Sequence, residues 1–147
     1  MGGHAYWYFV PYERDVQSAL DKLRAREFAA GRYSPAIRYL EFEEPDFTSQ
    51  QPERRCSSIQ AAIDASAEEG TRSILDIDRI GKTLGFGVAA PLPAKRLTEL
   101  YDTDRPTHAM VDNHEFFDDI PRGQCVYVIV YVDDKPSELF FAGYSYD

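Results

Sequence analysis

The hydrophobic pattern of the chain predicts extended segments near both of its ends. Residues 4–10 are mostly aromatic or β-branched and stop at Pro11, so they predict a strand that is covered on both faces and central in its sheet. Residues 124–132 are apolar almost throughout, which is typical of an interior strand. Together with residues 137–146, across the polar stretch 133–136, they predict a β-hairpin.

The middle of the chain contributes fewer strand signals. Residues 72–80 contain an apolar run interrupted by Asp76 and Asp78, and they predict a strand. Residues 34–42 are a further strand candidate. Residues 81–93 hold three glycines and two prolines and therefore predict a loop.

Apolar residues at helical spacing predict four helices. We expect them at residues 13–31, 57–70 and 94–102 and within residues 104–121. Gly31 is placed to cap the C-terminus of the first helix, and the spacing of Ser57 and Gln60 predicts a capping box at the start of the second.

These elements predict a single α+β domain over residues 1–147, with a mainly antiparallel sheet of four to five strands and the helices packed largely against one face. A chain of this length can bury one sizeable hydrophobic core. The expected strands are residues 4–10, 72–80, 124–132 and 137–146. The sequence contains no internal repeat and no linker that would divide it into two domains.

The charge balance narrows the choice of partner. The chain carries 25 acidic and 16 basic residues, a net charge of −9, so nucleic acid is an unfavourable partner and a basic protein is a complementary one. A net charge of this size also supports solubility without any partner. No apolar run approaches the ~18 residues of a membrane span, and no signal peptide is visible, so we expect a cytoplasmic protein with no membrane partner.

The stretch from residue 72 to residue 87 contains part of a phosphate-binding loop. Gly81, Lys82 and Thr83 match the end of that motif, but Asp76 stands where its first glycine is required. The glycines and prolines after Thr83 are also incompatible with the helix that should follow. We therefore expect no bound nucleotide at this stretch.

Other catalytic and metal-binding motifs are missing from the sequence. It contains no HExxH, no C-x-x-C and no G-x-S-x-G, so we expect no cofactor and no metal. Cys56 and Cys125 are expected to be reduced thiols, and a single long-range disulfide between them stays open. A Cys–His nucleophile pair also stays open because its members need only meet in space, although Cys125 at the head of an apolar strand is typical of a core residue.

Asp76 and Asp78 are the main chemical candidate. Two residues apart in a strand, their side chains would share one face at about 7 Å, where they could hold a divalent cation or divide acid and base duties. Arg72 and Arg79 are the neighbouring cations in the sequence. The alternative is a solvated strand face on which the two carboxylates have no special role, and we favour it because such a face needs no further explanation.

Three arginines form a second candidate site. Arg24, Arg26 and Arg32 cluster near the end of the first predicted helix, where they could clamp an anion. The alternative is a favourable interaction of basic side chains with the C-terminal end of the helix dipole. We favour this alternative because basic residues are common at helix ends in any case.

Three functional hypotheses follow from the sequence. The first is a non-catalytic binding or interaction module, in one version an immunity- or inhibitor-like protein that covers a basic partner. The acidic residues of that version are Glu41, Glu43, Glu44, Asp46, Asp118 and Asp119. The second is an enzyme or a small-ligand or metal site centred on Asp76 and Asp78, with nearby arginines. The third is a homodimer formed through a sheet edge or an aromatic face. The chain has ten tyrosines, which suit an interface, but we favour packing within the sheet as their explanation because tyrosine has a high β-propensity.

Overall fold

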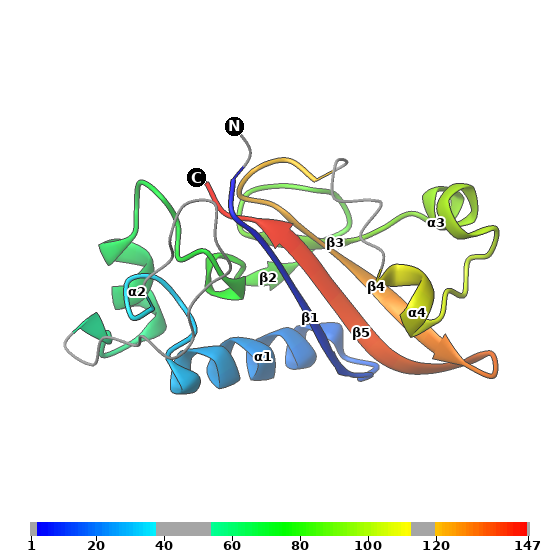
Figure 1. Ribbon diagram of the computed structural model, residues 1–147, viewed down its shortest axis with the longest axis horizontal. Coiled ribbons are helices and arrows are strands. Elements are labelled where there is room, and N and C mark those ends of the chain that lie inside the picture. Colours follow the sequence, from blue (N-terminus) through cyan, green and yellow to red (C-terminus); the bar gives the residue numbers. More distant parts are fainter. Residues whose placement is uncertain (1–2, 38–53, 113–119, 147) are drawn as a thin grey trace.

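The computed structural model describes residues 3–37, 54–112 and 120–146. Within these ranges the chain forms one mixed five-stranded sheet with the strand order β1-β5-β4-β3-β2. The strands are β1 (Ala5–Pro11), β2 (Arg79–Ile80), β3 (Val88–Pro91), β4 (Cys125–Val132) and β5 (Lys135–Tyr144). Figure 1 shows the long strands β1, β5 and β4 side by side.

The C-terminal hairpin is confirmed. β4 and β5 pair antiparallel along their lengths, and β1 pairs antiparallel with the other side of β5. The turn of the hairpin contains Asp133 and Asp134, whose φ angles are 50° and 62°. Both values lie in the left-handed region that a two-residue type I′ turn requires, and aspartate tolerates this region better than most residues.

The other half of the sheet corrects the expectation of a mainly antiparallel arrangement. β3 pairs parallel with β2 on one side and with β4 on the other. Parallel neighbours need a crossover connection, and the chain makes one through α3 (Ala94–Tyr101) and α4 (His108–Val111) before it returns as β4. β3 lies within the stretch 81–93 that the sequence predicts to be a loop. The sequence does not reveal this strand because four residues between glycines and prolines are too few to show a strand pattern.

The strand expected over residues 72–80 is wrong except at its end. Residues Ile74–Asp76 form a 3₁₀ turn, η2, and only Arg79–Ile80 pair as a strand. Ser73 explains the turn, because its Oγ accepts a hydrogen bond of 3.2 Å from the N–H of Leu75. Short polar side chains that bind the neighbouring backbone in this way compete with extended structure.

β1 is an edge strand of the described sheet, not the central strand that its two apolar faces predict. Val10 packs into the core on the α1 side, while the ring of Phe9 lies 4.5 Å from that of Phe140 on the opposite side. Both faces of β1 therefore carry packed side chains, although Trp7 is 42% exposed and β5 pairs with only one edge of the strand. The apolar pattern reports how the faces are covered and carries no information about the edges.

Two helices match their predictions closely. α1 (Val16–Ala30) begins after Asp15, whose side chain accepts the N–H of Ser18, and it ends at Gly31 with φ of 71°, as predicted. α3 matches the helix expected at residues 94–102. In the described part of the chain, none of the helices has both the length and the apolar character needed to cross a membrane.

The remaining local predictions are only partly met. α2 (Ile59–Ala65) is shorter than the expected 57–70, and Ser58, one residue later than predicted, caps it. α4 occupies four residues of the segment 104–121, part of which lies outside the described residues. The strand candidate at 34–42 begins as a turn and continues outside the described residues.

Helices cover both faces of the sheet, which corrects the expectation that they lie largely against one. Side chains alternate along β4, so Cys125 packs with Leu20 of α1. On the opposite face, Val128 packs with Leu97 of α3 and Val111 of α4. In Figure 1, α1 accordingly lies apart from α3 and α4, with the sheet between them.

Candidate functional site

Asp76 is a buried carboxylate at the end of η2, with 8% of its surface exposed. Its Oδ1 accepts a hydrogen bond of 2.8 Å from the N–H of Thr71. Its Oδ2 has no hydrogen-bond partner among the described residues, and a Cβ on Gly70 would lie 2.7 Å from it. Burial raises the pKa of Asp76, and the Thr71 hydrogen bonds and the charge of Arg24 offset this rise only in part.

Asp78 faces a different environment from Asp76. Its side chain is 58% exposed, and its Oδ1 lies 3.2 Å from the Nη1 of Arg79. Its backbone N–H donates to the carbonyl of Gly87. Because η2 replaces the expected strand, the two carboxylates do not share a strand face, and the geometry on which the paired-carboxylate hypothesis depended is wrong.

Sequence reasoning missed the neighbours of Asp76. A Cβ on Gly70 would approach Tyr146 as well as Asp76, at 3.1 Å from Cδ2 of the tyrosine. Burial raises the pKa of Tyr6, with further contributions from Cys125 and Asp76. The available signal was that a tyrosine in a buried strand needs a partner for its hydroxyl, but the sequence does not show which residue lies beside it.

The two cysteines are both free thiols, so the disulfide left open by the sequence is not formed. Burial raises the pKa of the Cys125 thiol, which lowers the fraction of the nucleophilic thiolate. Groups of three or more metal-binding side chains do not occur in the part of the chain that the structure describes.

The arginines near Asp76 are placed separately from one another. Arg24 reaches from α1 to η2, where its Nη2 donates to the carbonyl of Leu75 at 2.9 Å. Arg72 lies 3.8 Å from the carboxylate of Glu69, and Arg79 pairs with Asp78. Each of these guanidinium groups therefore has its own partner.

Arg26 and Arg32 do come together, around Glu27. This glutamate is only 3% exposed. Its carboxylate accepts two hydrogen bonds from Arg32, at 3.0 and 2.6 Å, and one from the Nε of Arg26 at 3.1 Å. The anion held at the end of α1 is thus a carboxylate of the protein itself, whereas Arg24 points elsewhere.

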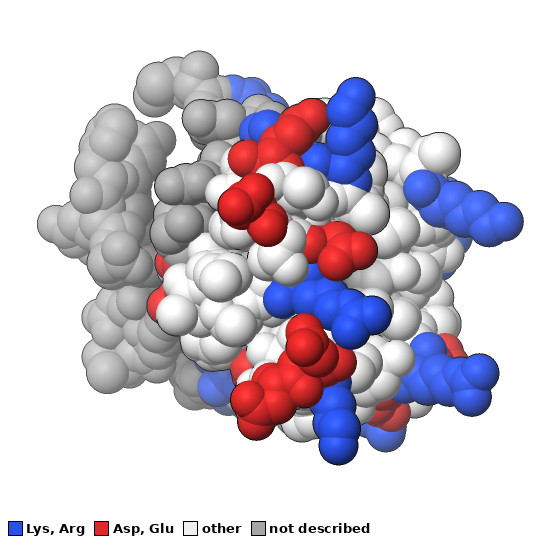
Figure 2. All heavy atoms as spheres, turned by 90° about the vertical axis from the view of Figure 1, so that its right-hand side faces the viewer, with Lys and Arg blue, Asp and Glu red and all other residues white. Residues whose placement is uncertain are grey.

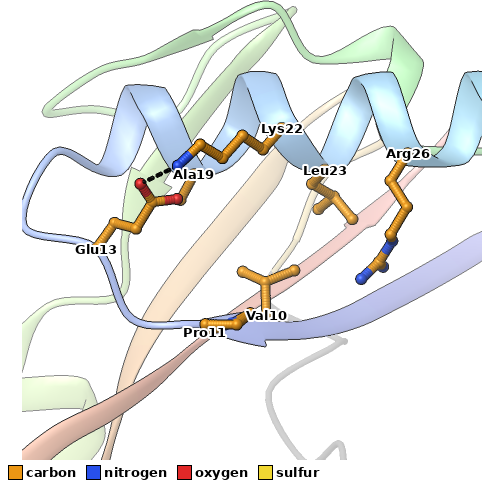
Figure 3. Close-up of a pocket in the computed structure, with 7 residues that line it drawn as sticks. All are labelled: Val10, Pro11, Glu13, Ala19, Lys22, Leu23 and Arg26. Carbon is orange, nitrogen blue, oxygen red and sulfur yellow. Dashed lines mark hydrogen bonds and ion pairs between the residues drawn. The ribbon is translucent and has the colours of Figure 1, made fainter.

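A groove of about 400 Å³ lies between β1 and α1. The residues that line it are Val10, Pro11, Glu13, Ala19, Lys22, Leu23 and Arg26. Figure 3 shows Val10 and Leu23 facing each other across it, with the Glu13–Lys22 ion pair at one end and Arg26 at the other. Of the candidate residues that the structure describes, Arg26 alone belongs to this lining.

The net charge is distributed unevenly along the chain. Residues 41–46 contain four of the 25 acidic residues and residues 115–119 contain three more, and neither stretch contains a basic residue. The predicted acidic contact residues, Glu41, Glu43, Glu44, Asp46, Asp118 and Asp119, all lie outside the described residues.

No family model, curated protein or solved structure matches this chain. The chemistry open to its side chains therefore follows from their own geometry and charge.

Proposed function

We propose that the chain is a non-catalytic binding module that captures a basic protein partner, in the manner of an immunity or inhibitor protein. The observation that carries this proposal is the segregation of charge. Two acidic segments, residues 41–46 and residues 115–119, hold seven acidic residues and no basic one, whereas the whole chain has 25 acidic and 16 basic residues. Such concentration gives the acidic residues a local field that steers a basic partner and is screened by salt.

One face of the described structure does not show this clustering of acidic residues. Figure 2 shows acidic and basic side chains interspersed over the face that lies at the right-hand side of Figure 1. Opposite charges at such spacing cancel beyond about 10 Å at moderate salt. This face therefore favours solubility and leaves electrostatic capture to the acidic segments.

The buried ionisable groups support a binding role over a catalytic one. Glu27 is held by two arginines, Arg24 binds a backbone carbonyl, and Asp76 accepts a backbone N–H. In each case the charged group is bonded within the protein, locally for Glu27 and Asp76 and across 51 positions for Arg24. A second candidate function, an acid–base or small-ligand site at Asp76, is favoured by the buried Oδ2 and by the raised pKa of this carboxyl.

The test compares two variants with the same change in net charge. One replaces Glu41, Glu43, Glu44 and Asp46 by the corresponding amides. The control does the same at Glu68, Asp104, Asp133 and Asp134, which are exposed residues of the described structure. Each protein is used for affinity capture from native lysate at low and high salt. We expect a captured protein that is lost at high salt, lost with the first variant and retained with the control. Capture that is insensitive to salt, or equal loss with both variants, would contradict the proposal.

The homodimer also stays a prediction. Phe86 is 65% exposed, and its ring lies 5.9 Å from that of Tyr146, so these residues form an aromatic surface that a second copy could cover. Sedimentation velocity over a hundredfold concentration range tests this. A constant sedimentation coefficient rules out self-association in that range.

A further inference from the structure

We propose that the groove between β1 and α1 is a docking site for an extended peptide that ends in an apolar residue with a free C-terminal carboxylate. The proposal does not depend on the acidic segments, because every residue that carries it belongs to the described part of the chain. The residues that line the groove support this proposal. The floor is apolar, and at one end Arg26 uses only its Nε in a hydrogen bond among the described residues.

The floor of the groove is apolar. Val10 and Pro11 come from β1, and Ala19 and Leu23 come from α1. Figure 3 shows the side chains of Val10 and Leu23 directed toward each other across the opening. A volume of about 400 Å³ lies within the range of ligand sites, roughly 300–1,000 Å³, and it suits one or two apolar side chains.

Arg26 provides an anion-binding group at one end of the groove. Its Nε donates to Glu27, and it makes no further hydrogen bond within the described residues. Glu27 already accepts two hydrogen bonds from Arg32, so one carboxylate faces two guanidinium groups. The Nη atoms of Arg26 can therefore donate to an incoming carboxylate, in the paired geometry that arginine favours.

The opposite end of the groove has no such preference for an anion. There the Nζ of Lys22 lies 2.7 Å from the carboxylate of Glu13, and the two charges cancel. The difference between the ends orients the ligand, with its carboxylate at Arg26 and its preceding residues toward Glu13. Charge complementarity thus favours a terminal carboxylate over a basic or neutral end.

The edge of β1 favours an extended peptide. The N–H of Tyr12 donates to the carbonyl of Ser137, so these two residues form a hydrogen-bonded pair that continues the pairing of β1 with β5. Hydrogen-bonded and non-hydrogen-bonded pairs alternate along antiparallel strands, so the backbone groups of Phe9 and Pro11 point away from β5. The N–H and C=O of Phe9 are thus directed to the side on which none of the described strands pairs with β1, and an added peptide strand would need this geometry. Pro11 has no N–H and ends this pairing beside the Glu13–Lys22 pair.

The test is an NMR titration of the ¹⁵N-labelled full chain with acetyl-Ala-Ala-Val-Leu. The matched control peptide has the same sequence and a C-terminal amide. We expect saturable shifts at Val10, Leu23 and Arg26 with the acid and much weaker ones with the amide. Arg26→Gln should weaken binding of the acid about tenfold, since a hydrogen bond to a charged group is lost. Arg122→Gln, an exposed arginine outside the groove lining, should leave it unchanged.

A second variant tests the electrostatics in the opposite direction. Glu13→Gln releases Lys22 from its ion pair, so it should strengthen binding of the acid and leave the amide unaffected. Equal binding of acid and amide, shifts confined to other surfaces, or no change with Arg26→Gln would overturn the proposal. Binding of octanoate in the groove without binding of the peptide would overturn the choice of a peptide and assign the groove to small carboxylates.

Discussion

The Nη2 atom of Arg24 in α1 donates a hydrogen bond of 2.9 Å to the carbonyl oxygen of Leu75 in η2. These residues are 51 positions apart in the chain. The bond connects the segment before β2 to α1, and both elements pack against the same face of the sheet. It also gives a structural role to one member of the arginine cluster.

Replacing this arginine should therefore destabilise the fold. Arg24→Met keeps much of the apolar stem but removes the donor, and we expect the free energy of unfolding to fall by about 1–2 kcal/mol. Urea denaturation followed by circular dichroism measures this. Arg122→Met, at an exposed position, should change stability by less than about 0.5 kcal/mol. Equal effects of the two substitutions would show that the bond to Leu75 contributes nothing.

The buried carboxyl of Asp76 should make stability depend on pH in a specific direction. Because the pKa is raised in the folded state, the protonated form is favoured by folding. Its contribution is complete below the unfolded pKa of about 3.9 and is lost as the pH rises through the higher folded value. Asp76→Asn removes this titration, so the stability of the variant relative to the wild type should increase from pH 4 to pH 7.

Urea denaturation of both proteins at several pH values in this window provides the measurement. Other carboxyl groups titrate in the same range, but they are common to both proteins and cancel in the difference. Asp78→Asn is the matched control, since this neighbouring aspartate is 58% exposed. A difference between wild type and Asp76→Asn that stays constant with pH would refute the role assigned to burial.

The parts of the fold that the sequence predicts are those with local signals. The hairpin follows from a long apolar run and the polar stretch 133–136, and α1 follows from its apolar stripe and Gly31. β3 escapes prediction because Ala89 and Ala90 are small, and their pairing depends on a distant strand. Residues 72–80 have the apolar pattern of a strand, yet most of them do not form one. The hydrogen bonds from Leu75 to Ser73 and from Thr71 to Asp76 favour a turn in this segment instead.

The candidate site was predictable only in its components. Arg26 and Asp76 were both named from the sequence, yet their neighbours are set by tertiary packing. Asp76 is buried against Gly70 and Tyr146, and Arg26 joins a groove with Val10 of the adjacent strand. Strand alternation identifies the face on which Val10 lies, but the packing of α1 against that face of β1 has no sequence signal.

Glu27 offers a test of the arginine pair at the end of α1. Glu27→Gln leaves Arg26 and Arg32 without their shared carboxylate, and we expect a loss of roughly 2 kcal/mol. The value is below that for a fully buried pair because Arg26 and Arg32 are 48% and 37% exposed. Thermal and urea unfolding should both report it. Asp21→Asn, on the exposed side of the same helix, should cost less than about 0.5 kcal/mol, and parity between the two would contradict the assignment.

Two buried tyrosines should respond differently to loss of the hydroxyl. The Oη of Tyr33 accepts the N–H of Cys56 at 2.9 Å, whereas the Oη of Tyr6 has no hydrogen-bond partner among the described residues. Tyr33→Phe leaves a donor unpaired and should destabilise the protein by about 1–2 kcal/mol. Tyr6→Phe removes a buried polar group that gains nothing from folding, so it should be neutral or stabilising. Both rings are at least 95% buried, which makes the comparison one of hydrogen bonding alone. Urea midpoints measured side by side decide the matter, and a loss for Tyr6→Phe as large as that for Tyr33→Phe would mean that the Tyr6 hydroxyl is bonded in solution.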